Sequence, residues 1–547
     1  MFKRLLPWGL LLRLAARRYK TIDPLSMAAR IRGFAQPSEV QEPIELLRAG
    51  IVFHARGLIN TKAIQHNLDW IWPYWIERQF NPRDQSFIPR AFSFSHINLT
   101  HRNWTAVGQP DLPFYPIVDP RGLVTPLQDG WSIDCWFMHE DGETICPSQL
   151  DSVKQTLVDD LNRRVVTRCS TDTLELITET AVNTDPAKPL LQITARAETS
   201  MSGWLIFSLR PANPEGIQFI DSAELLENGN GWLVNETTEV LWQHKPEKVL
   251  FSDYHRGDVF FHLKDTQTEN NSTCSIGMIT SASFYRVEAN GSEQEHTLSI
   301  PLPRAPVTAV DSTPKNWPEA EKEAAQLSIP DPWIKFLYDT ATRSLIHLSA
   351  GDMIPGPYTY NRFWFRDACI MLNALLTAGL TDRCRRHLDK FPALQRRDGF
   401  FHSQDGEWDS NGQVLWILNR YRLLSGGSFN PDWLKPMLKG ARWIARKRIT
   451  KTDNPKVKGL LPPGFSAEHF GPNDNYYWDD FWAVGGLYAA AETTAALGLE
   501  KEQQAISHNA RQMQEDLLGS IALVAAERNT PAIPTSPNRR LDSAAIG

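Results

Sequence analysis

The chain has 547 residues, of which 42% are hydrophobic and 22% are charged, and its formal net charge is −6. This composition excludes a disordered or low-complexity protein, and the acidic balance argues against nucleic-acid binding as the main role. At about 100–200 residues per domain, the length predicts two to four domains.

The first twenty residues, MFKRLLPWGLLLRLAARRYK, combine apolar and basic side chains. The apolar run at 5–16 is interrupted by Arg13 and is far shorter than the ~20 residues that span a bilayer. Arg17 and Arg18 leave no clean cleavage site for a signal peptide. We therefore assign residues 1–39 to a basic N-terminal arm, which is either a soluble segment or an amphipathic helix that contacts a membrane surface.

Residues 40–304 are predicted to form a domain rich in β-sandwich structure. Short runs of alternating or β-branched residues recur through this region, separated by turns such as Asn228-Gly-Asn-Gly. We expect strands at 165–169, 174–178, 190–195, 204–209, 232–233, 259–263, 275–281 and 297–302. One helix-like stretch, at 148–162, interrupts them. Many short strands at this spacing favour a sandwich over βαβ units.

After a proline-rich linker at 305–330, the hydrophobic period becomes helical. We expect helices at 333–349, 366–379, 381–391, 411–424, 431–448, 480–497 and 501–518. Several of them are joined by Gly-, Pro- and Asp-rich connections that carry aromatic residues. Residues 331–547 are therefore predicted to form part of an all-α toroid of paired helices, with an active face made by loops.

Three loop-to-helix segments share one order: aromatic residues, then an acid, then a helix. They are YTYNRFWFRD at 358–367, DGEWDSNGQ at 405–413 and NDNYYWDDFW at 473–482. Sugar hydrolysis needs an apolar platform for the ring, charged groups for the hydroxyls and carboxyls for proton transfer. Acids at helix starts also serve as caps, which is the structural alternative for each segment. The repetition of one arrangement favours a sugar site.

The first two segments resemble a known group of enzymes. FWFRDACIMLNALL resembles the segment that opens an inner helix in glucoamylase-type and glycogen-debranching-type glycosidases. The resemblance implies that Arg366 and Asp367, beside Trp364, hold the non-reducing-end sugar; a structural ion pair is the alternative. GEWDSNGQVLWIL is similar to the second inner loop of these enzymes and to a trehalase segment. It implies further sugar-facing side chains, namely Glu407, Trp408, Asp409 and Gln413.

The third segment, DNYYWDDFWAVGGL, resembles the loop that carries the general acid in the same enzymes. The resemblance places this acid at Asp479, with Asp480 as the alternative register and Glu468 on the preceding loop as a second alternative. Asp480 is otherwise expected to bind substrate together with Tyr477 and Trp478. The aromatic neighbours of Asp479 are expected to desolvate its carboxyl and raise its pKa, as a proton donor at neutral pH requires.

Together the segments imply a six-hairpin (α/α)6-toroid glycosidase that hydrolyses α-glucosidic bonds by a single displacement with inversion. A complete toroid needs more helices than the chain offers after residue 331, and the late catalytic base of the family has no counterpart before Gly547. We therefore expect a toroid that is incomplete in this chain and an activity compromised by C-terminal truncation, with the base lying beyond Gly547 or on a separate polypeptide.

The expected ligand is an oligosaccharide or a glucosylated small molecule. The six cysteines lack the spacing of a zinc site or a disulfide framework, a pattern typical of a reducing compartment. We therefore expect a cytoplasmic protein that needs no metal or organic cofactor and binds no nucleic acid.

Three other functions stay open at this stage. A non-catalytic carbohydrate-binding or regulatory remnant would keep the sugar site without the base. A glycoside phosphorylase would need basic or hydroxyl residues in late loops, which the chain does not offer. A structural membrane-associated protein would depend on the basic N-terminal arm.

Overall fold

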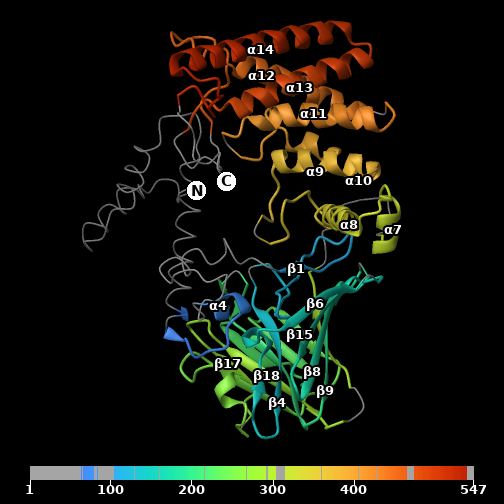
Figure 1. The fold of residues 1–547 in the computed structure, drawn as a ribbon, viewed down its shortest axis with the longest axis vertical. Coiled ribbons are helices and arrows are strands. Elements are labelled where there is room, and N and C mark those ends of the chain that lie inside the picture. Colours follow the sequence, from blue (N-terminus) through green and yellow to red (C-terminus); the bar gives the residue numbers. More distant parts are fainter. Residues whose placement is uncertain are drawn as a thin grey trace, which may run out of the picture. The chain divides into compact units, whose positions relative to one another are not determined.

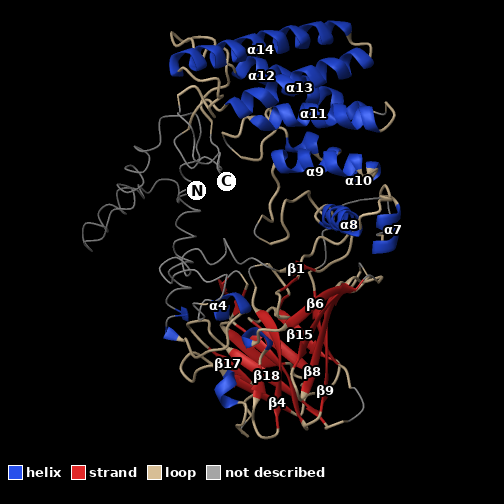
Figure 2. Cartoon of the chain, viewed as in Figure 1, coloured by secondary structure: helices blue, strands red, loops and turns tan. Residues whose placement is uncertain are grey.

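A computed structural model describes residues 63–64, 66–78, 83, 104–128, 130–158, 160–185, 187–214, 216–266, 268–290, 294–303, 315–358, 360–404, 406–427, 429–464 and 473–538. The basic arm predicted at 1–39 lies outside these residues. Contacts divide the chain into two compact units, which we describe separately. We call residues 52–361 the β unit and the part that begins at Arg362 the helical unit; Figure 1 and Figure 2 show their sheets and helices. None of the described helices is both long and apolar enough to cross a membrane.

Two antiparallel sheets form the body of the β unit. The strand order of the first sheet is β1-β2-β3-β4-β10-β18-β16, with β5 beside β4, and that of the second is β17-β13-β14-β15-β19-β9-β8-β7-β6. The first comprises β1 (Thr105–Ala106), β2 (Ile117–Val118), β3 (Val124–Thr125), β4 (Ser132–His139), β5 (Thr144–Ile145), β10 (Gly203–Arg210), β16 (Lys248–Ser252) and β18 (Thr280–Val287). The second comprises β6 (Val153–Val158), β7 (Arg164–Ser170), β8 (Leu174–Val182), β9 (Leu190–Thr199), β13 (Ser222–Leu225), β14 (Gly231–Val234), β15 (Thr238–Trp242), β17 (Asn271–Thr273) and β19 (His296–Pro301). A separate ladder joins β11 (Ala212–Asn213) to β12 (Gly216–Ile217).

The hydrophobic core of the β unit contains side chains from both sheets. Side chains of β9 alternate between buried and more exposed positions, as expected of a strand with one face in a core. β10 is buried on both faces. Its Phe207 belongs to the shared core, while Ile206 packs in a second cluster with Trp136 and Val259 on the other face of the same sheet. The prediction of antiparallel sheets in the N-terminal part and helices in the C-terminal part is confirmed.

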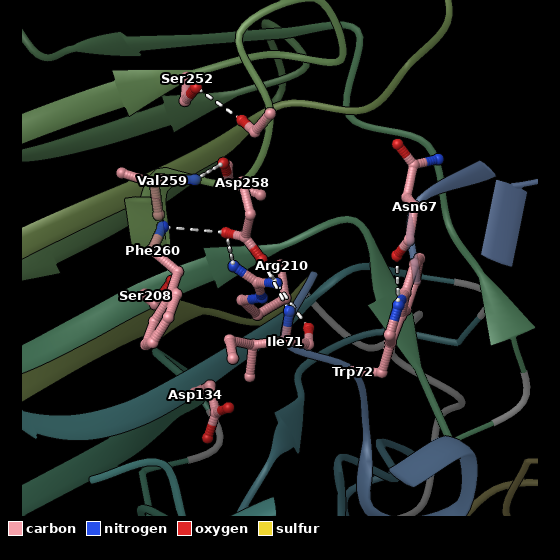
Figure 3. Close-up of polar contacts among 12 residues, drawn as sticks. Asn67, Ile71, Trp72, Asp134, Ser208, Arg210, Ser252, Asp258, Val259 and Phe260 are labelled. Atoms are coloured by element: carbon pink, nitrogen blue, oxygen red, sulfur yellow. Dashed lines mark hydrogen bonds and ion pairs between the residues drawn. The ribbon is translucent and has the colours of Figure 1, made fainter. Parts of the chain in front are cut away.

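A buried ion pair anchors an N-terminal segment onto the β unit (Figure 3). Arg210 of β10 donates to both carboxylate oxygens of Asp258, at 2.7 and 2.5 Å. Arg210 also donates to the carbonyl of Ile71 at 2.6 Å, and Asp258 accepts from the amide of Ile71 at 2.9 Å. The pair therefore provides hydrogen bonds to both backbone groups of Ile71, which lies just before helix α4 (Tyr74–Arg78). The buried charges and the buried backbone groups thus have hydrogen-bond partners in one another.

Three expected elements of the β unit are wrong. Of the strand expected at 275–281, only Thr280 and Ser281 lie in a strand, at the start of β18, while residues 275–277 form a turn after β17. The helix-like stretch at 148–162 contains a short 3₁₀ turn, η2 (Pro147–Gln149), and the edge strand β6, whose side chains alternate in exposure and pair with β7. The strand expected at 259–263 is the 3₁₀ helix η3 (Val259–His262). The carboxylate of Asp258 accepts from the amide of Phe260 and caps this turn, which favours helical over extended backbone.

Two helices group with the sheets by their contacts: α7 (Trp317–Lys322) and α8 (Pro332–His347). α7 lies within the expected linker and begins with a reciprocal cap between Asn316 and Glu319. The contact-based division falls after Asn361. The domain limits expected at 39, 304 and 330 stay predictions.

The helical unit contains pairs of helices that overlap the expected ones. They are α9 (Phe365–Thr377), α10 (Thr381–Leu388), α11 (Asp409–Leu424), α12 (Leu434–Lys447), α13 (Tyr477–Ala496) and α14 (Glu500–Arg528), with the 3₁₀ turns η4 (Phe391–Leu394) and η5 (Pro431–Trp433). The expected incompleteness of the toroid stays a prediction.

Two glycines bring α11 and α13 into backbone contact. A Cβ on Gly412 would lie 2.1 Å from the carbonyl oxygen of Trp482, and one on Gly486 would lie 2.3 Å from the carbonyl oxygen of Gly412. Further along, Thr493 of α13 donates to Asn419 of α11 at 2.9 Å. Because the contacts advance in the same direction along both helices, α11 and α13 run parallel and their first turns lie together.

Candidate active site

Each of the three aromatic and acidic segments leads into the first turn of a helix. α9 begins at Phe365, α11 at Asp409 and α13 at Tyr477, so an acid occupies the first turn of each. Partial positive charge at a helix start favours a carboxylate there. No capping bond from the preceding side chain is present at these three starts, all of which lie in the described part of the chain.

Arg366 of α9 joins the first segment to the second. Its guanidinium lies 3.1 Å from Glu407 and 3.5 Å from Asp409, and its Nε lies 4.0 Å from Asp367. The side chains of Glu407 and Asp409 are buried. One cation is therefore shared by three carboxylates, and we call these four residues together with Asp479 the acid cluster.

Trp478 of α13 joins the third segment to the second. Its indole N–H donates to Asp409 at 2.8 Å, and Gln413 donates to the same carboxylate oxygen at 3.1 Å. The Trp478 side chain is nevertheless 46% exposed. The Trp478 ring is thus fixed beside the acid cluster while almost half of its side chain is accessible to solvent.

Asp479 is a third buried acid of the cluster, beside Glu407 and Asp409. It is 4% exposed, and its Oδ2 has no hydrogen-bond partner among the described residues. Burial raises the pKa of the Asp479 carboxyl well above its ordinary value. The negative charges of Asp409, Asp480 and Glu407 raise this pKa further, and Arg366 lowers it. These effects together favour the protonated form of the Asp479 carboxyl.

Asp480, next in the chain, has a different environment. It is fully buried, and its Oδ1 accepts from the amide of Leu461 at 2.9 Å. Burial raises its pKa to about 8, while the bond from Leu461 and the charge of Arg448 lower it. The Asp480 carboxylate is thus bonded to the loop at Leu461, while its Oδ2, like that of Asp479, has no hydrogen-bond partner among the described residues.

Three aromatic residues that the sequence singled out have partners outside the acid cluster. Trp408 is buried against Phe400 and Trp443, and its indole donates to the carbonyl of Pro463 at 3.4 Å. The hydroxyl of Tyr477 bonds to Ser520, and the Trp364 indole donates to Gln404. These two bonds are 2.8 Å long for Tyr477 and 3.0 Å long for Trp364.

The contacts among the described residues bring seven of the singled-out residues together: Arg366, Asp367, Glu407, Asp409, Gln413, Trp478 and Asp479. Their roles in binding or catalysis stay predictions. The alternative acid Glu468 lies outside the described residues. Sequence reasoning did not single out Asp474 or Asn475, which organise the loop before α13; the only signal was a polar Asn-Asp-Asn run ahead of the aromatic residues.

Within the described ranges, no group of three or more His, Cys, Asp or Glu side chains is arranged to hold a metal ion. The carboxylates of the acid cluster are contacted by the guanidinium of Arg366, and Asp409 also accepts from the indole of Trp478 and the amide of Gln413. Such donors suit a site that binds hydroxyl groups through hydrogen bonds.

Comparisons with known proteins bear on the fold. No protein-family model and no curated protein matches the sequence. A bacterial glucoamylase complexed with acarbose matches with a TM-score of 0.54 at 12% sequence identity, over 78% of this chain and 68% of that chain. A family GH92 alpha-mannosidase from Bacteroides thetaiotaomicron matches with a TM-score of 0.31 at 9% identity, over 71% of this chain and 56% of that chain. The glucoamylase match shows a shared glycoside-hydrolase-type fold across most of the chain.

Proposed function

We propose that this protein is a glycoside hydrolase-like protein that acts on α-glucosidic bonds, by a single displacement with inversion. Its substrate would be an oligosaccharide or a glucosylated small molecule. The observation that carries the proposal is the acid cluster, in which Asp479, a buried acid with a raised pKa, lies beside carboxylates bound to Arg366.

The cluster has the chemistry to hold a terminal sugar. Carboxylates accept from sugar hydroxyls, and the guanidinium of Arg366 donates to them in a fixed geometry. The exposed Trp478 ring provides an apolar surface for the ring face, and its bond to Asp409 fixes that surface relative to the acids. This combination supports recognition of a polyhydroxylated ring rather than of an apolar or an anionic ligand.

Asp479 is the proposed general acid. Proton donation to a leaving glycosidic oxygen requires a carboxyl that is still protonated at working pH. Burial and the neighbouring negative charges give Asp479 this property. Asp480 also has a raised pKa, but its bond to the Leu461 amide favours a structural role.

Inversion requires a second carboxylate about 6.5–9.5 Å from the acid, which activates water on the opposite face of the sugar. Glu407 and Asp409 lie in the cluster, but both contact Arg366, which stabilises their charged forms and weakens them as bases. This observation favours a second candidate function, a carbohydrate-binding protein that keeps the sugar site without turnover.

Hydrolysis and binding measured on the full chain distinguish the two candidates. Maltose, isomaltose and trehalose are suitable substrates, and proton NMR of the first product shows which anomer is released. We expect β-glucose from an inverting enzyme and, for Asp479→Asn, a turnover at least about 100-fold lower with binding retained. Asp432→Asn, which changes an exposed aspartate at another helix start of the same unit, is the matched control and should leave turnover unchanged.

Each outcome assigns the function. Binding without hydrolysis by the unmodified chain would establish the carbohydrate-binding protein. Absence of both binding and hydrolysis for all three sugars would reject the proposal. Full turnover by Asp479→Asn would remove Asp479 from the role of acid.

A further inference from the structure

The segment that follows α14 returns to the loop that precedes α13. Ser536 donates to one carboxylate oxygen of Asp474 at 2.7 Å, and Asn538 donates to the other at 2.7 Å. The amide of Tyr477 donates to the carbonyl of Thr535 at 3.0 Å. Residues 535–538, which we call the return segment, therefore hold the loop at three points.

Asp474 also binds its own loop. Its Oδ1 accepts from the amide of Asn475 at 2.8 Å, and its backbone pairs with Gly464 in both directions, at 2.8 and 3.1 Å. Asp474 and Ser536 are both buried. A buried carboxylate that accepts from three donors on two separate segments fixes both segments strongly, because each bond to a charged acceptor is short and directional.

The same loop determines where α13 begins. The amide of Tyr476 donates to the carbonyl of Asp474, and the amide of Asp479 donates to the carbonyl of Tyr476, both at 3.1 Å. Asn475 donates to the carbonyl of Leu461 at 2.7 Å. Two successive backbone hydrogen bonds, through Tyr476, therefore connect Asp474 to the backbone of Asp479.

Rotation of the first turn decides which side chain enters the acid cluster. Successive helix residues point about 100° apart, so a rotation of one position would exchange Asp479 for a neighbour. The hydroxyl of Tyr477 bonds to Ser520 of α14 at 2.8 Å, and its ring packs against Leu460 and Leu517. The return segment and Tyr477 together therefore fix the rotation that directs Trp478 to Asp409 and Asp479 to the cluster.

We propose that Asp474 is a positioning residue for the general acid: held by Ser536 and Asn538, it fixes the first turn of α13 so that Asp479 lies in the acid cluster. The catalytic consequence rests on the proposed function of the site. The positioning itself concerns the conformation of residues 474–480 and can be measured without turnover.

The test is Asp474→Asn in the full chain. An asparagine keeps the size of the side chain but offers one acceptor oxygen in place of two, so either Ser536 or Asn538 loses its acceptor. Amide hydrogen exchange of a peptide covering 474–482 should become at least about tenfold faster, while peptides within 500–515 of α14 stay unchanged. Asp453→Asn, at an exposed position of the same unit, is the control and should change neither.

Kinetics separate positioning from general stabilisation. We expect kcat to fall about 10- to 100-fold with little change in KM, because a displaced acid fails in the chemical step. The basic limb of the kcat–pH profile should move to lower pH by about one unit, because a displaced Asp479 is better solvated. Ser536→Ala, which removes one donor, should give smaller changes in the same directions and serves if Asp474→Asn does not fold.

The outcomes are distinguishable from those of the proposed function. Unchanged exchange at 474–482 in both variants would overturn the positioning role. Faster exchange with an unchanged kcat and pH profile would also overturn it, because Asp474 would then only stabilise the loop. If the unmodified chain has no turnover, the proposed function fails, and the exchange measurement alone decides whether Asp474 fixes the first turn of α13.

Discussion

Arg210 in the β unit and Arg366 in the helical unit both lie among buried carboxylates, but their bonds differ. Arg210 donates to both oxygens of Asp258 at 2.7 and 2.5 Å, and the docked backbone of Ile71 completes the arrangement. Arg366 is shared by three carboxylates at 3.1 to 4.0 Å. The first pair is balanced and closely bonded, which is the character of a structural anchor.

The second arrangement is less evenly balanced. Asp479 lies beside negative charges that raise its pKa, and the side chain of Trp478, which donates to Asp409, is 46% exposed. Local charge imbalance of this kind is costly for stability and is typical of functional sites. The balance of bonds, rather than burial of charge alone, therefore distinguishes the structural pair from the proposed sugar site.

Loss of the cation from the Arg210–Asp258 pair should lower the stability of the protein more than any other change considered. Arg210→Met leaves the fully buried Asp258 without its cation, so the free energy of unfolding should fall by about 3–5 kcal/mol. Urea denaturation of the full chain measures this loss. Arg168→Met is the matched control, because its partner Glu175 and Arg168 itself are largely exposed, and it should cost at most about 1 kcal/mol. Equal losses in both variants would show that the Arg210 pair is no anchor.

A smaller effect concerns Asp480 in the helical unit. Burial raises its pKa to about 8, so the folded state holds a proton that the unfolded chain releases near pH 4. Its contribution to stability is complete below about pH 4 and is lost as pH rises toward 8. Asp480→Asn imitates the protonated acid and keeps the acceptor for Leu461. It should be more stable than the unmodified chain by roughly 2–4 kcal/mol at pH 8, with the difference disappearing at pH 4.

Thermal unfolding followed between pH 4 and pH 9 measures this difference. Asp453→Asn, at an exposed site, should show the same pH dependence as the unmodified chain. A constant difference between Asp480→Asn and the unmodified chain across this range would contradict the raised pKa.

Periodic segments of the fold were predictable from the sequence. β8, β9 and β10 and helices α9 to α14 lie where alternation or helical period placed them. One error fell where a long-range contact overrides local preference. At 259–263 a β-branched and aromatic run forms η3 because Asp258 caps it and is itself held by Arg210. Such a contact cannot be inferred from a single stretch of sequence.

The candidate site divides in the same way. The order of the three segments was enough to predict that Arg366, Asp409 and Asp479 lie near one another. Sequence could not decide the directions of adjacent side chains, because each depends on helix rotation set by distant partners. For example, Trp408 packs against Trp443 and Asp480 bonds to Leu461, although each directly neighbours a residue of the acid cluster in the sequence.

Calorimetric titration of maltotriose into the full chain measures whether the acid cluster holds a sugar. We expect measurable binding that weakens at least about tenfold in Arg366→Met, because hydrogen bonds from a charged donor to the sugar are lost. Arg168→Met, in the β unit, should bind as the unmodified chain does. No binding by the unmodified chain, or equal binding by Arg366→Met, would contradict the claim that the acid cluster holds a sugar.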